Sequence, residues 1–470
     1  MASDIWSISG LIIVAGLLLF FYHDNGDVVE IANNWEKIIS LPKRISKRIA
    51  IGLNVNLDLI VSGTKLLEEL GEKPCNVISD QPVLDNLDHV QQCLAYSMQN
   101  CAGLERFFSN RSLFGVITDA AEKIDHEYFI GGNAALMAEK LVELSSKETT
   151  ILLAGPIGTK LKQLLNPAIQ TLEVKSSVQD EIHLILEYAK HEKWGTATAT
   201  CANRIIFSHD ISNSELSTLE ELETHLKHFH PDLLVLAGAH LLDRYNEQFY
   251  KQRISRIATG LHNIPEHVPV HIELASTANM KFCELLSRTL LPLVDSVGLN
   301  EQELQFIAHS NAYPMKKSVE GFKAPEIGYL ADLLYWMLTS HAGRLSRVHM
   351  HSLTFHIIAV VSDKWDNTES SVAAGARIAG LQACNLTQFS DDDFSLLVPQ
   401  IISFSVDDEK LRRSPVIFSR DKPVLSWRRK DILFYFTPVL VCNQPVKTVG
   451  LGDAISSTAL LHTQLQTNVV

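Results

Sequence analysis

From Pro231 onward, short apolar segments alternate with stretches that are long enough to form helices, and this alternation constrains the fold more than any other feature. Continuous apolar runs are typical of strands that are buried on both faces. Such runs lie at 233–238, 268–275, 294–299 and 353–359, with helices predicted to about Leu261, through Leu290 and from Asn300. Strands separated by helices build a mostly parallel sheet with both faces covered. The sequence therefore predicts an α/β fold.

The chain before Pro231 predicts a second set of strands and glycine turns. A strand at 48–58 ends in alternating polar residues, which would place Asn54, Asn56 and Asp58 on one face. Three polar groups on one face suit a ligand with hydroxyls, although a solvated strand edge explains them slightly better when they are taken alone. Further elements are a helix over 87–108 with Glu105 near its end, a strand–turn–helix unit at 128–138, strands within 150–158, 180–188 and 203–207, a helix within 363–387 and an apolar segment at 434–442.

Gly450-Leu451-Gly452-Asp453, just before a predicted C-terminal helix, is a candidate anion site. Glycines let the backbone turn tightly and approach a ligand, and a helix N-terminus attracts anions. A carboxylate at this place could accept a proton from a hydroxyl group while backbone amides stabilise a phosphoryl group in transfer. Taken alone, the stretch also fits a glycine turn with an aspartate N-cap.

Acidic residues recur at the predicted strand ends and helix starts. Glu273, Glu301, Glu303 and Asp453 could hold Mg²⁺ beside a nucleotide, because this ion prefers carboxylate oxygens and keeps several waters. Arg204 could supply the cation that phosphoryl transfer requires. Asn300 and Glu303 also have the spacing of a helix capping box. On an α/β frame, the combined pattern favours a kinase.

The net charge argues against nucleic-acid binding, and the cysteine spacing argues against a zinc site. The chain has 41 basic and 54 acidic residues and a net charge of −13, which argues against nucleic acid as a main partner. The seven cysteines include no CxxC pair, so a zinc site is not expected. Because their number is odd, at least one cysteine is free or pairs between chains in an oxidising compartment.

The N-terminal segment indicates targeting to the secretory pathway. Residues 5–22 are apolar and uncharged, a length between that of a signal-peptide core and a short membrane span. No basic region precedes them and no A-x-A-like cleavage site follows, so an uncleaved signal-anchor is preferred over a cleaved signal in segment 1–22. A linker with an amphipathic helix is predicted at 23–46. The sequons at Asn110 and Asn385 fit a location in the endoplasmic reticulum lumen, or anchored to its membrane and facing the lumen, with secretion as the alternative.

Seven segments, in order along the chain, resemble the ADP-dependent glucokinases of the ribokinase-like superfamily, in their animal form. The segments are GLNVNLD from Gly52, GGNA from Gly131, HLILEY from His183, PDLLVLAG from Pro231, HIELAS from His271, SVGLNEQE from Ser296 and TVGLGDAIS from Thr448. The resemblance implies a kinase domain at 47–470, with a large mostly parallel sheet flanked by helices and a smaller β-containing lid built from about 54–135 and 175–210. It also implies a monomer, and contact with a membrane is expected only through the N-terminal apolar segment.

The resemblance implies phosphorylation of glucose at its 6-hydroxyl by ADP, in glycolysis, with Mg²⁺, giving glucose 6-phosphate and AMP. Transferred by motif, the sugar ligands are Asn56, Asp58, Glu105, Gly132 and His183. The residues that bind the metal are Glu273, Glu301, Glu303 and Asp453, and those that bind the nucleotide are Arg204 and Val449. Gly450 and Gly452 form the anion hole, and Asp453 is the catalytic base. Glu105 favours glucose because it would repel a phosphorylated sugar. Read alone, a histidine such as His183 is more often structural than functional, and the Gly131-Gly132 pair is equally a tight connection.

One departure and two alternatives accompany this assignment. The anion-hole stretch reads GLGD, where many ATP-using relatives of the superfamily have alanine in the middle position, and this difference is typical of the ADP-dependent branch. A lumenal sugar- or nucleotide-binding protein without catalysis is one alternative. A kinase of the same fold for another small sugar is the other.

Overall fold

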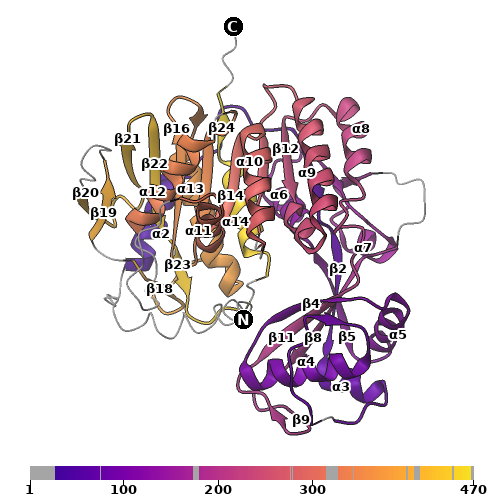
Figure 1. The fold of residues 1–470 in the computed structure, drawn as a ribbon. Helices are drawn as coiled ribbons and strands as arrows, with labels where there is room; N and C mark the ends of the chain where they lie inside the picture. The colour runs from indigo at the N-terminus through magenta and orange to yellow at the C-terminus, as the bar shows by residue number, and fades with distance from the viewer. Residues whose placement is uncertain are drawn as a thin grey trace.

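The computed structural model describes residues 27–74, 76–172, 179–275, 277, 279–313, 327–341, 343–398, 401–406, 413–446 and 449–466. Two sheets of ten and six strands organise this part of the chain, each with its own layer of helices (Figure 1). The apolar segment 5–22, Cys75, Ser276 and Thr448 lie outside the described residues. Within the described ranges, no helix is both long and apolar enough to cross a membrane.

The ten-stranded sheet is mostly parallel, as the sequence predicts. Its parallel part consists, in spatial order, of β7 (Ile169–Thr171), β6 (Thr150–Ala154), β1 (Arg48–Leu53), β12 (Leu233–Ala237), β13 (Val270–Glu273), β14 (Ser296–Asn300) and β15 (Arg347–His351). An antiparallel part follows with β16 (Phe355–Val361), β22 (Ile432–Pro438) and β21 (Leu425–Arg429).

The expectation that the strand at 353–359 continues the parallel repeat is wrong. β16 pairs antiparallel with β15, and His351 lies opposite His356. Only the residues between His351 and Phe355 connect the two strands. A parallel connection needs a crossover of a dozen or more residues, so a link this short forces the chain to reverse.

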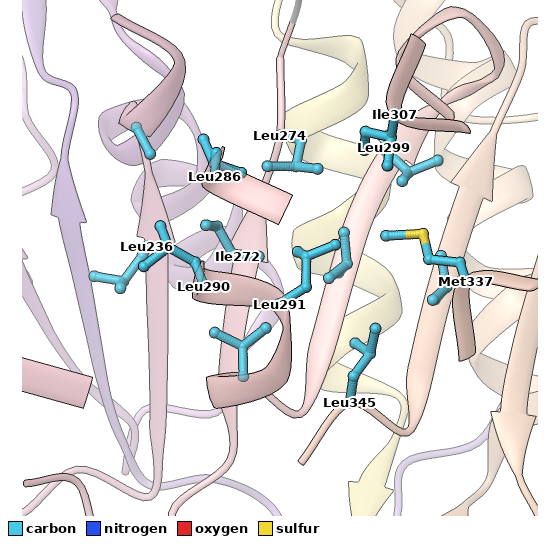
Figure 2. Close-up of a cluster of buried hydrophobic side chains, with 14 of the residues drawn as sticks. Leu236, Ile272, Leu274, Leu286, Leu290, Leu291, Leu299, Ile307, Met337 and Leu345 are labelled. Atoms are coloured by element: carbon cyan, nitrogen blue, oxygen red, sulfur yellow. The ribbon is translucent and has the colours of Figure 1, made fainter. Parts of the chain in front are cut away.

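Helices cover both faces of this sheet. One face packs against α8 (Leu219–Phe229), α9 (Glu247–His262), α10 (Met280–Leu290), α11 (Glu301–Ser310) and α12 (Ile327–Ser340). The other packs against α6 (Asn133–Leu144), α13 (Thr368–Cys384), α14 (Leu451–Leu461) and α2 (Asp27–Ile38). Figure 2 shows part of the first interface, where Leu236 and Ile272 of the strands lie near Leu286 and Leu290 of α10, and Leu299 lies near Ile307 of α11.

The sequence of α10 explains why a helix forms there and which side it buries. The Asn279 side chain accepts hydrogen bonds from the backbone N–H groups of Lys281 and Phe282 and so caps the first turn. Phe282, Leu286 and Leu290 recur every four residues and are buried on one face. Burial of each such side chain contributes about 1.5–3 kcal/mol, so the apolar stripe fixes the helix against the sheet.

The helix predicted within 23–46 belongs to the core and is not part of a linker. Trp35 of α2 is fully buried, and its indole N–H donates to Thr437 Oγ1 at 2.9 Å. Ile31 is also fully buried and lies in the cluster that includes residues of α13. The segment at the N-terminal end of the described chain is therefore anchored to the large sheet.

The six-stranded sheet belongs to a smaller unit below the large one in Figure 1. Its spatial order is β3 (Val83–Leu84), β4 (Leu104–Phe108), β11 (Asn203–Ser208), β8 (Ile182–Tyr188), β2 (Asn56–Ser62) and β5 (His126–Gly131). Side chains of α3 (Gly63–Glu69), α4 (Leu87–Asn100) and α5 (Arg111–Ala121) join one face of these strands in a single buried cluster. All of these elements lie within the two segments assigned to the lid.

The predicted helix over 87–108 is too long. Helix α4 ends at Asn100, Cys101 has a left-handed backbone conformation with φ of 53°, and Gly103 precedes β4. Left-handed residues commonly terminate helices. Glu105 consequently lies on a strand, beside Ile206 of β11, and not at the end of a helix.

The predicted strand 48–58 is two strands in different sheets. β1 ends at Leu53 in the large sheet and β2 begins at Asn56 in the smaller one. At the crossing, the N–H of Asn54 donates to the carbonyl of Ala237. The Asn213 side chain accepts from the N–H of Val55 and donates to its carbonyl. Asn54 therefore does not share a strand face with Asn56 and Asp58, contrary to the prediction.

Minor elements and two disulfides complete the described chain. The minor elements are α7 (Thr159–Leu164), η1 (Ala239–Arg244), η2 (Leu291–Leu293), β9 (Lys193–Trp194), β10 (Ala197–Thr198), β17 (Trp365–Asp366), β18 (Phe394–Leu396), β19 (Ile401–Ser405), β20 (Arg413–Ile417), β23 (Leu440–Cys442) and β24 (Gln464–Leu465). The disulfides link Cys101 with Cys201 and Cys384 with Cys442, whereas Cys93 and Cys283 are free and buried.

Candidate active site

Asp453 is a buried carboxylate in the first turn of α14. It is 5% exposed, and its Oδ1 accepts a hydrogen bond of 2.8 Å from Asn133 Nδ2. Asn133, at the start of α6, in turn accepts at Oδ1 from Asn54 Nδ2 at 3.1 Å. Burial, together with the charge of Glu273, raises the pKa of Asp453 to about 7. The two asparagines thus orient a carboxylate whose basicity suits proton transfer near neutral pH.

The glycines around Asp453 shape the N-terminal end of α14. Gly450 is the N-cap residue with φ of 66°, a conformation in which side chains are strained. A Cβ at Gly452 would lie 3.1 Å from His351 Cε1, so a larger residue would crowd that ring. The first N–H groups of a helix lack partners within the helix, and they lie here beside a buried acid. This arrangement suits an anion that approaches the end of α14.

Glu273, at the end of β13, is held by two imidazoles. His271 Nε2 lies 3.0 Å from Glu273 Oε2, and His351 Nε2 lies 3.3 Å from Glu273 Oε1. Burial opposes ionisation, but these two hydrogen bonds lower the pKa of Glu273 to about 2. Ser296 Oγ lies 2.9 Å from His271 Nδ1, which fixes the second side of that ring. Glu273 is therefore a preformed carboxylate close to Asp453.

Glu301 and Glu303 lie in the first turn of α11. This helix begins directly after β14, which pairs with the strand that carries Glu273. Burial raises the pKa of Glu301. The pKa of Glu303 is raised to about 7, mainly by burial and to a smaller extent by the negative charges of Glu273 and Glu301. Both oxygens of Glu303 accept hydrogen bonds of 2.8 Å from Asn300, one from its N–H and one from its side chain. The capping box that the sequence left open is thus present, and Glu303 is committed to it.

The chemistry of these acids fits a cation that is only partly coordinated by the protein. No group of three or more His, Cys, Asp or Glu side chains in the described part of the chain could hold a metal ion by itself. Mg²⁺ differs from zinc in keeping several waters and binding through one or two carboxylates and substrate phosphates. Buried carboxylates with raised pKa values repel one another, and a divalent cation would relieve this repulsion. The residues present therefore fit Mg²⁺ held partly through water.

The sugar residues inferred from the family motifs gather on one face of the smaller sheet. Asp58 and His183 are direct neighbours on β2 and β8, and Asn56 Nδ2 donates to Asp58 Oδ1 at 2.7 Å. Burial raises the pKa of Asp58, opposed by the charges of His183 and Arg204. Glu105, on β4, is exposed and close enough to influence both Asp58 and His183 electrostatically. Two acids and an imidazole therefore form a polar patch.

The glycine pair at the end of β5 closes against this patch. A Cβ at Gly131 would collide with the side chains of Asn56 and Asp58. Gly132 has φ of 86°, and its backbone packs against the carbonyl of Asn54. The pair is thus a tight connection from β5 into α6, and it also brings the Gly132 backbone to the edge of the polar patch.

The two predicted nucleotide residues lie apart in the structure. Arg204 is half-buried on β11, and its charge acts on Asp58 in the polar patch of the smaller sheet, the face where the sugar residues lie. Val449 directly precedes the Gly450 cap of α14 and is 37% exposed. The structure brings Asp453, Glu273, Glu301 and Glu303 together on the large sheet, and Asn56, Asp58, Glu105, His183 and Arg204 together on the smaller one.

Sequence reasoning missed several side chains that orient these groups, and three of them illustrate why. Asn133 bonds Asp453, His351 bonds Glu273, and Asp210 bonds His183 Nε2 at 3.0 Å. Asn133 follows the glycine pair and His351 ends a β-strand, so strand-end position was a usable signal for these two. Asp210 lies in a loop with no motif of its own, and only the fold brings it to His183.

Comparisons with known proteins place this geometry in a family. The family model described as the ADP-specific phosphofructokinase/glucokinase conserved region matches residues 47–462. The ADP-dependent glucokinase of Bos taurus is 38% identical over 443 residues, covering 93% of this chain and 88% of the relative. The probable ADP-dependent glucokinase of Caenorhabditis elegans is 36% identical over 445 residues, covering 92% and 88%.

A solved structure shows the same fold at lower identity. The hypothetical ADP-dependent phosphofructokinase from Pyrococcus horikoshii OT3 aligns with a TM-score of 0.68 and 20% identity, covering 90% of this chain and 98% of that one. The α/β architecture is thus shared across the whole length of that protein. With the family model matched from Lys47 to His462, the chain belongs to the ADP-specific phosphofructokinase/glucokinase family.

Proposed function

We propose that this protein transfers the terminal phosphoryl group of ADP to the 6-hydroxyl of glucose, forming glucose 6-phosphate and AMP as a step of glycolysis. The observation that carries the proposal is the buried Asp453 carboxylate at the N-terminal end of α14, with its pKa raised to about 7 mainly by burial. The identity with relatives named ADP-dependent glucokinases supports the choice of donor and acceptor.

Asp453 is assigned as the general base for the glucose hydroxyl. Asn133 donates to its Oδ1 and leaves Oδ2 as the oxygen that can accept the sugar proton. The backbone N–H groups at Gly450 and Gly452 would stabilise the charge on the transferring phosphoryl group. The phosphoryl group passes from the ADP β-phosphate to the hydroxyl oxygen, the hydroxyl proton passes to Asp453, and AMP leaves with the bridging oxygen.

Glu273, Glu301 and Glu303 would hold Mg²⁺, directly or through water. When bound, Mg²⁺ supplies positive charge that offsets the charge of the phosphate oxygens during transfer. The hydrogen bonds from His271 and His351 fix the direction of the Glu273 carboxylate. Arg204 and Val449 are retained as candidate contacts of the nucleotide.

Glucose is favoured over a phosphorylated sugar because its site is acidic. Asp58 and Glu105 lie on the sugar face of the smaller sheet, and His183 is the imidazole between them. A sugar phosphate would meet two carboxylates, whereas a free sugar offers hydroxyl groups that carboxylates accept from. Asn56 and the backbone of Gly132 complete the proposed sugar contacts.

A panel of acceptors with ADP and Mg²⁺ tests the substrate class. We expect glucose to be phosphorylated and fructose 6-phosphate to be a poor acceptor. Faster turnover of fructose 6-phosphate would overturn the glucose assignment. Tight binding of glucose without turnover of any acceptor would instead support the alternative of a binding protein without catalysis.

We also propose that the catalytic unit lies in the lumen of the endoplasmic reticulum as a monomer, anchored or directed there by residues 1–22. Two disulfides support an oxidising compartment, because such bonds are rare in reducing ones. The sequon residues Asn110 and Asn385 are both exposed, as glycosylation would require. Secretion after cleavage of the segment is the alternative, and sequencing the mature N-terminus decides between them.

A further inference from the structure

Asp210 is a buried carboxylate for which the proposed reaction has no role so far. It follows β11, is 2% exposed, and belongs to the segment that leads from the smaller sheet back to α8 of the large unit. A buried acid is costly unless it is fully hydrogen-bonded. Its partners therefore indicate what it is held in place to do.

One partner of Asp210 is the histidine of the sugar face. His183 Nε2 lies 3.0 Å from Asp210 Oδ2, and the His183 side chain is 14% exposed. His183 adjoins Asp58 on β2 and Ser208 on β11, so its ring lies on the same face as Asp58. Because Asp210 occupies Nε2, Nδ1 is the ring nitrogen left to meet a ligand on that face.

The other partners of Asp210 lie at the crossing between the two sheets. The N–H of Asn213 donates to Asp210 Oδ1 at 3.0 Å, and Asn213 Nδ2 donates to Asp210 Oδ2 at 2.6 Å. The same Asn213 side chain bonds both backbone groups of Val55, at 3.0 and 2.8 Å. Asn213 is fully buried. Asp210 is therefore rigidly attached to the crossing at Val55 and cannot easily follow a rotation of the His183 ring.

The charges around His183 favour its protonated form. Burial opposes protonation, but the hydrogen bond and charge of Asp210, followed by the charges of Asp58 and Glu105, raise the pKa of His183 to about 9. Two further charged groups lie nearby. Arg204 on β11 interacts electrostatically with Asp58. Glu181, just before β8, interacts electrostatically with both Asp210 and His183. In the protonated ring, Nδ1 carries a hydrogen and can donate to a sugar oxygen.

We propose that Asp210 is a positioning residue for sugar binding: its hydrogen bond to Nε2 fixes the His183 ring so that Nδ1 donates to a glucose oxygen. This inference rests on the proposed function, because it takes glucose as the ligand of His183. Asp210 itself does not contact the sugar.

The proposal predicts a specific change in the Asp210→Asn variant. Asparagine is uncharged and has one oxygen, so it cannot accept all three of the hydrogen bonds that Asp210 accepts, two from Asn213 and one from His183. We expect the glucose KM to rise at least about tenfold, as for the loss of a hydrogen bond to a charged group, while kcat changes by less than about threefold. Glu181→Gln is the matched control, because it touches the same loop through the Ser212 N–H but does not bond His183. Its glucose KM should stay within about twofold of wild type.

The pH profile separates positioning from a general structural effect. A histidine with a raised pKa is charged below that value, so wild-type glucose KM should be flat from pH 7 to 8 and rise as pH passes about 9. In Asp210→Asn, only the charges of Asp58 and Glu105 still oppose the effect of burial, so the rise in KM should move to a clearly lower pH. An unchanged glucose KM and an unchanged profile in this variant would overturn the proposal. Should that variant fail to fold, His183→Gln takes its place, and its glucose KM must no longer rise as pH passes about 9. A KM that still rises there in His183→Gln would overturn the proposal equally.

A measurement without turnover keeps this inference separate from the proposed function. Proton–carbon NMR of protein labelled at histidine Cε1 follows the His183 ring, identified by its absence in His183→Gln. We expect titration near pH 9 in wild type and at a clearly lower pH in Asp210→Asn. A ring that titrates near 6.5 in both proteins would overturn the Asp210 inference, even where glucose is phosphorylated. Absence of glucose phosphorylation with the expected titration would reject only the proposed function.

Discussion

Asp453 is the residue on which the proposed chemistry depends most. Asp453→Asn keeps the size of the side chain but removes the base, so turnover should fall by about 10²–10⁴-fold. Glucose binding and thermal stability should remain close to those of wild type, since the proposed sugar contacts lie on the smaller sheet. Steady-state kinetics together with calorimetric binding of glucose checks both expectations. Near-normal turnover in the variant would remove Asp453 from the role of base.

Glu273 is expected to govern the dependence on Mg²⁺. Glu273→Gln removes one negative charge from the proposed metal site but leaves an oxygen that can still accept from one histidine. The Mg²⁺ concentration for half-maximal rate should rise at least about tenfold, because the strength of such sites depends on ligand charge. Titrating the rate with Mg²⁺ at fixed ADP measures this. The same half-maximal concentration in wild type and variant would argue against a metal role for Glu273.

Single residues at strand ends were accessible to sequence reasoning because glycines and acids are informative there. Asp453, Glu273 and the Asn300–Glu303 turn occur at the ends of apolar runs, and the structure places them on neighbouring elements. The partners through which such residues act were not accessible. Asp210 reaches His183 only after β11 and β8 have paired, and His351 reaches Glu273 from two strands away in the sheet. No local pattern encodes such distances.

The left-handed conformation of Gly450 at the start of α14 predicts that alanine destabilises the protein there but not at Gly115. Gly450→Ala would force a left-handed backbone onto alanine, and its Cβ would lie 2.8 Å from Leu136 Cδ1. We expect a loss of about 1–3 kcal/mol in unfolding free energy and a fall in turnover. Gly115→Ala in α5 is the control, because a Cβ there meets nothing within 4 Å and should stabilise the helix by up to about 1 kcal/mol. Denaturant unfolding of both variants measures this difference, and equal stabilities would contradict the strain argument.

Element types followed from the sequence wherever an apolar run was long and its ends were marked. The parallel strands from β12 to β14 lie where the pattern predicts them. The errors occurred where tertiary pairing decided the outcome. Strand β4 forms because it pairs with β11, and the chain at 48–58 divides because Asn213, more than 150 residues away, holds Val55 between the sheets. β16 reverses because the connection from β15 is too short for a crossover.

The two sheets carry complementary halves of the proposed site, so substrates should draw them together. The residues proposed as base and metal ligands lie on the large sheet, whereas those proposed to bind the sugar lie on the smaller one. Catalysis requires the 6-hydroxyl to reach Asp453, which closure of the smaller unit would achieve. Small-angle X-ray scattering should show a smaller radius of gyration with glucose, AMP and Mg²⁺ than without them. An unchanged radius at saturating ligand would argue against closure.

The central claim is that this chain uses ADP to phosphorylate glucose, and a coupled assay of glucose 6-phosphate formation tests it most directly. The assay compares ADP with ATP as donor at equal Mg²⁺, in wild type and in Asp453→Asn. We predict glucose 6-phosphate with ADP, a rate at least about tenfold lower with ATP, and loss of activity in the variant. Absence of product with either donor, or a higher rate with ATP, would contradict the account.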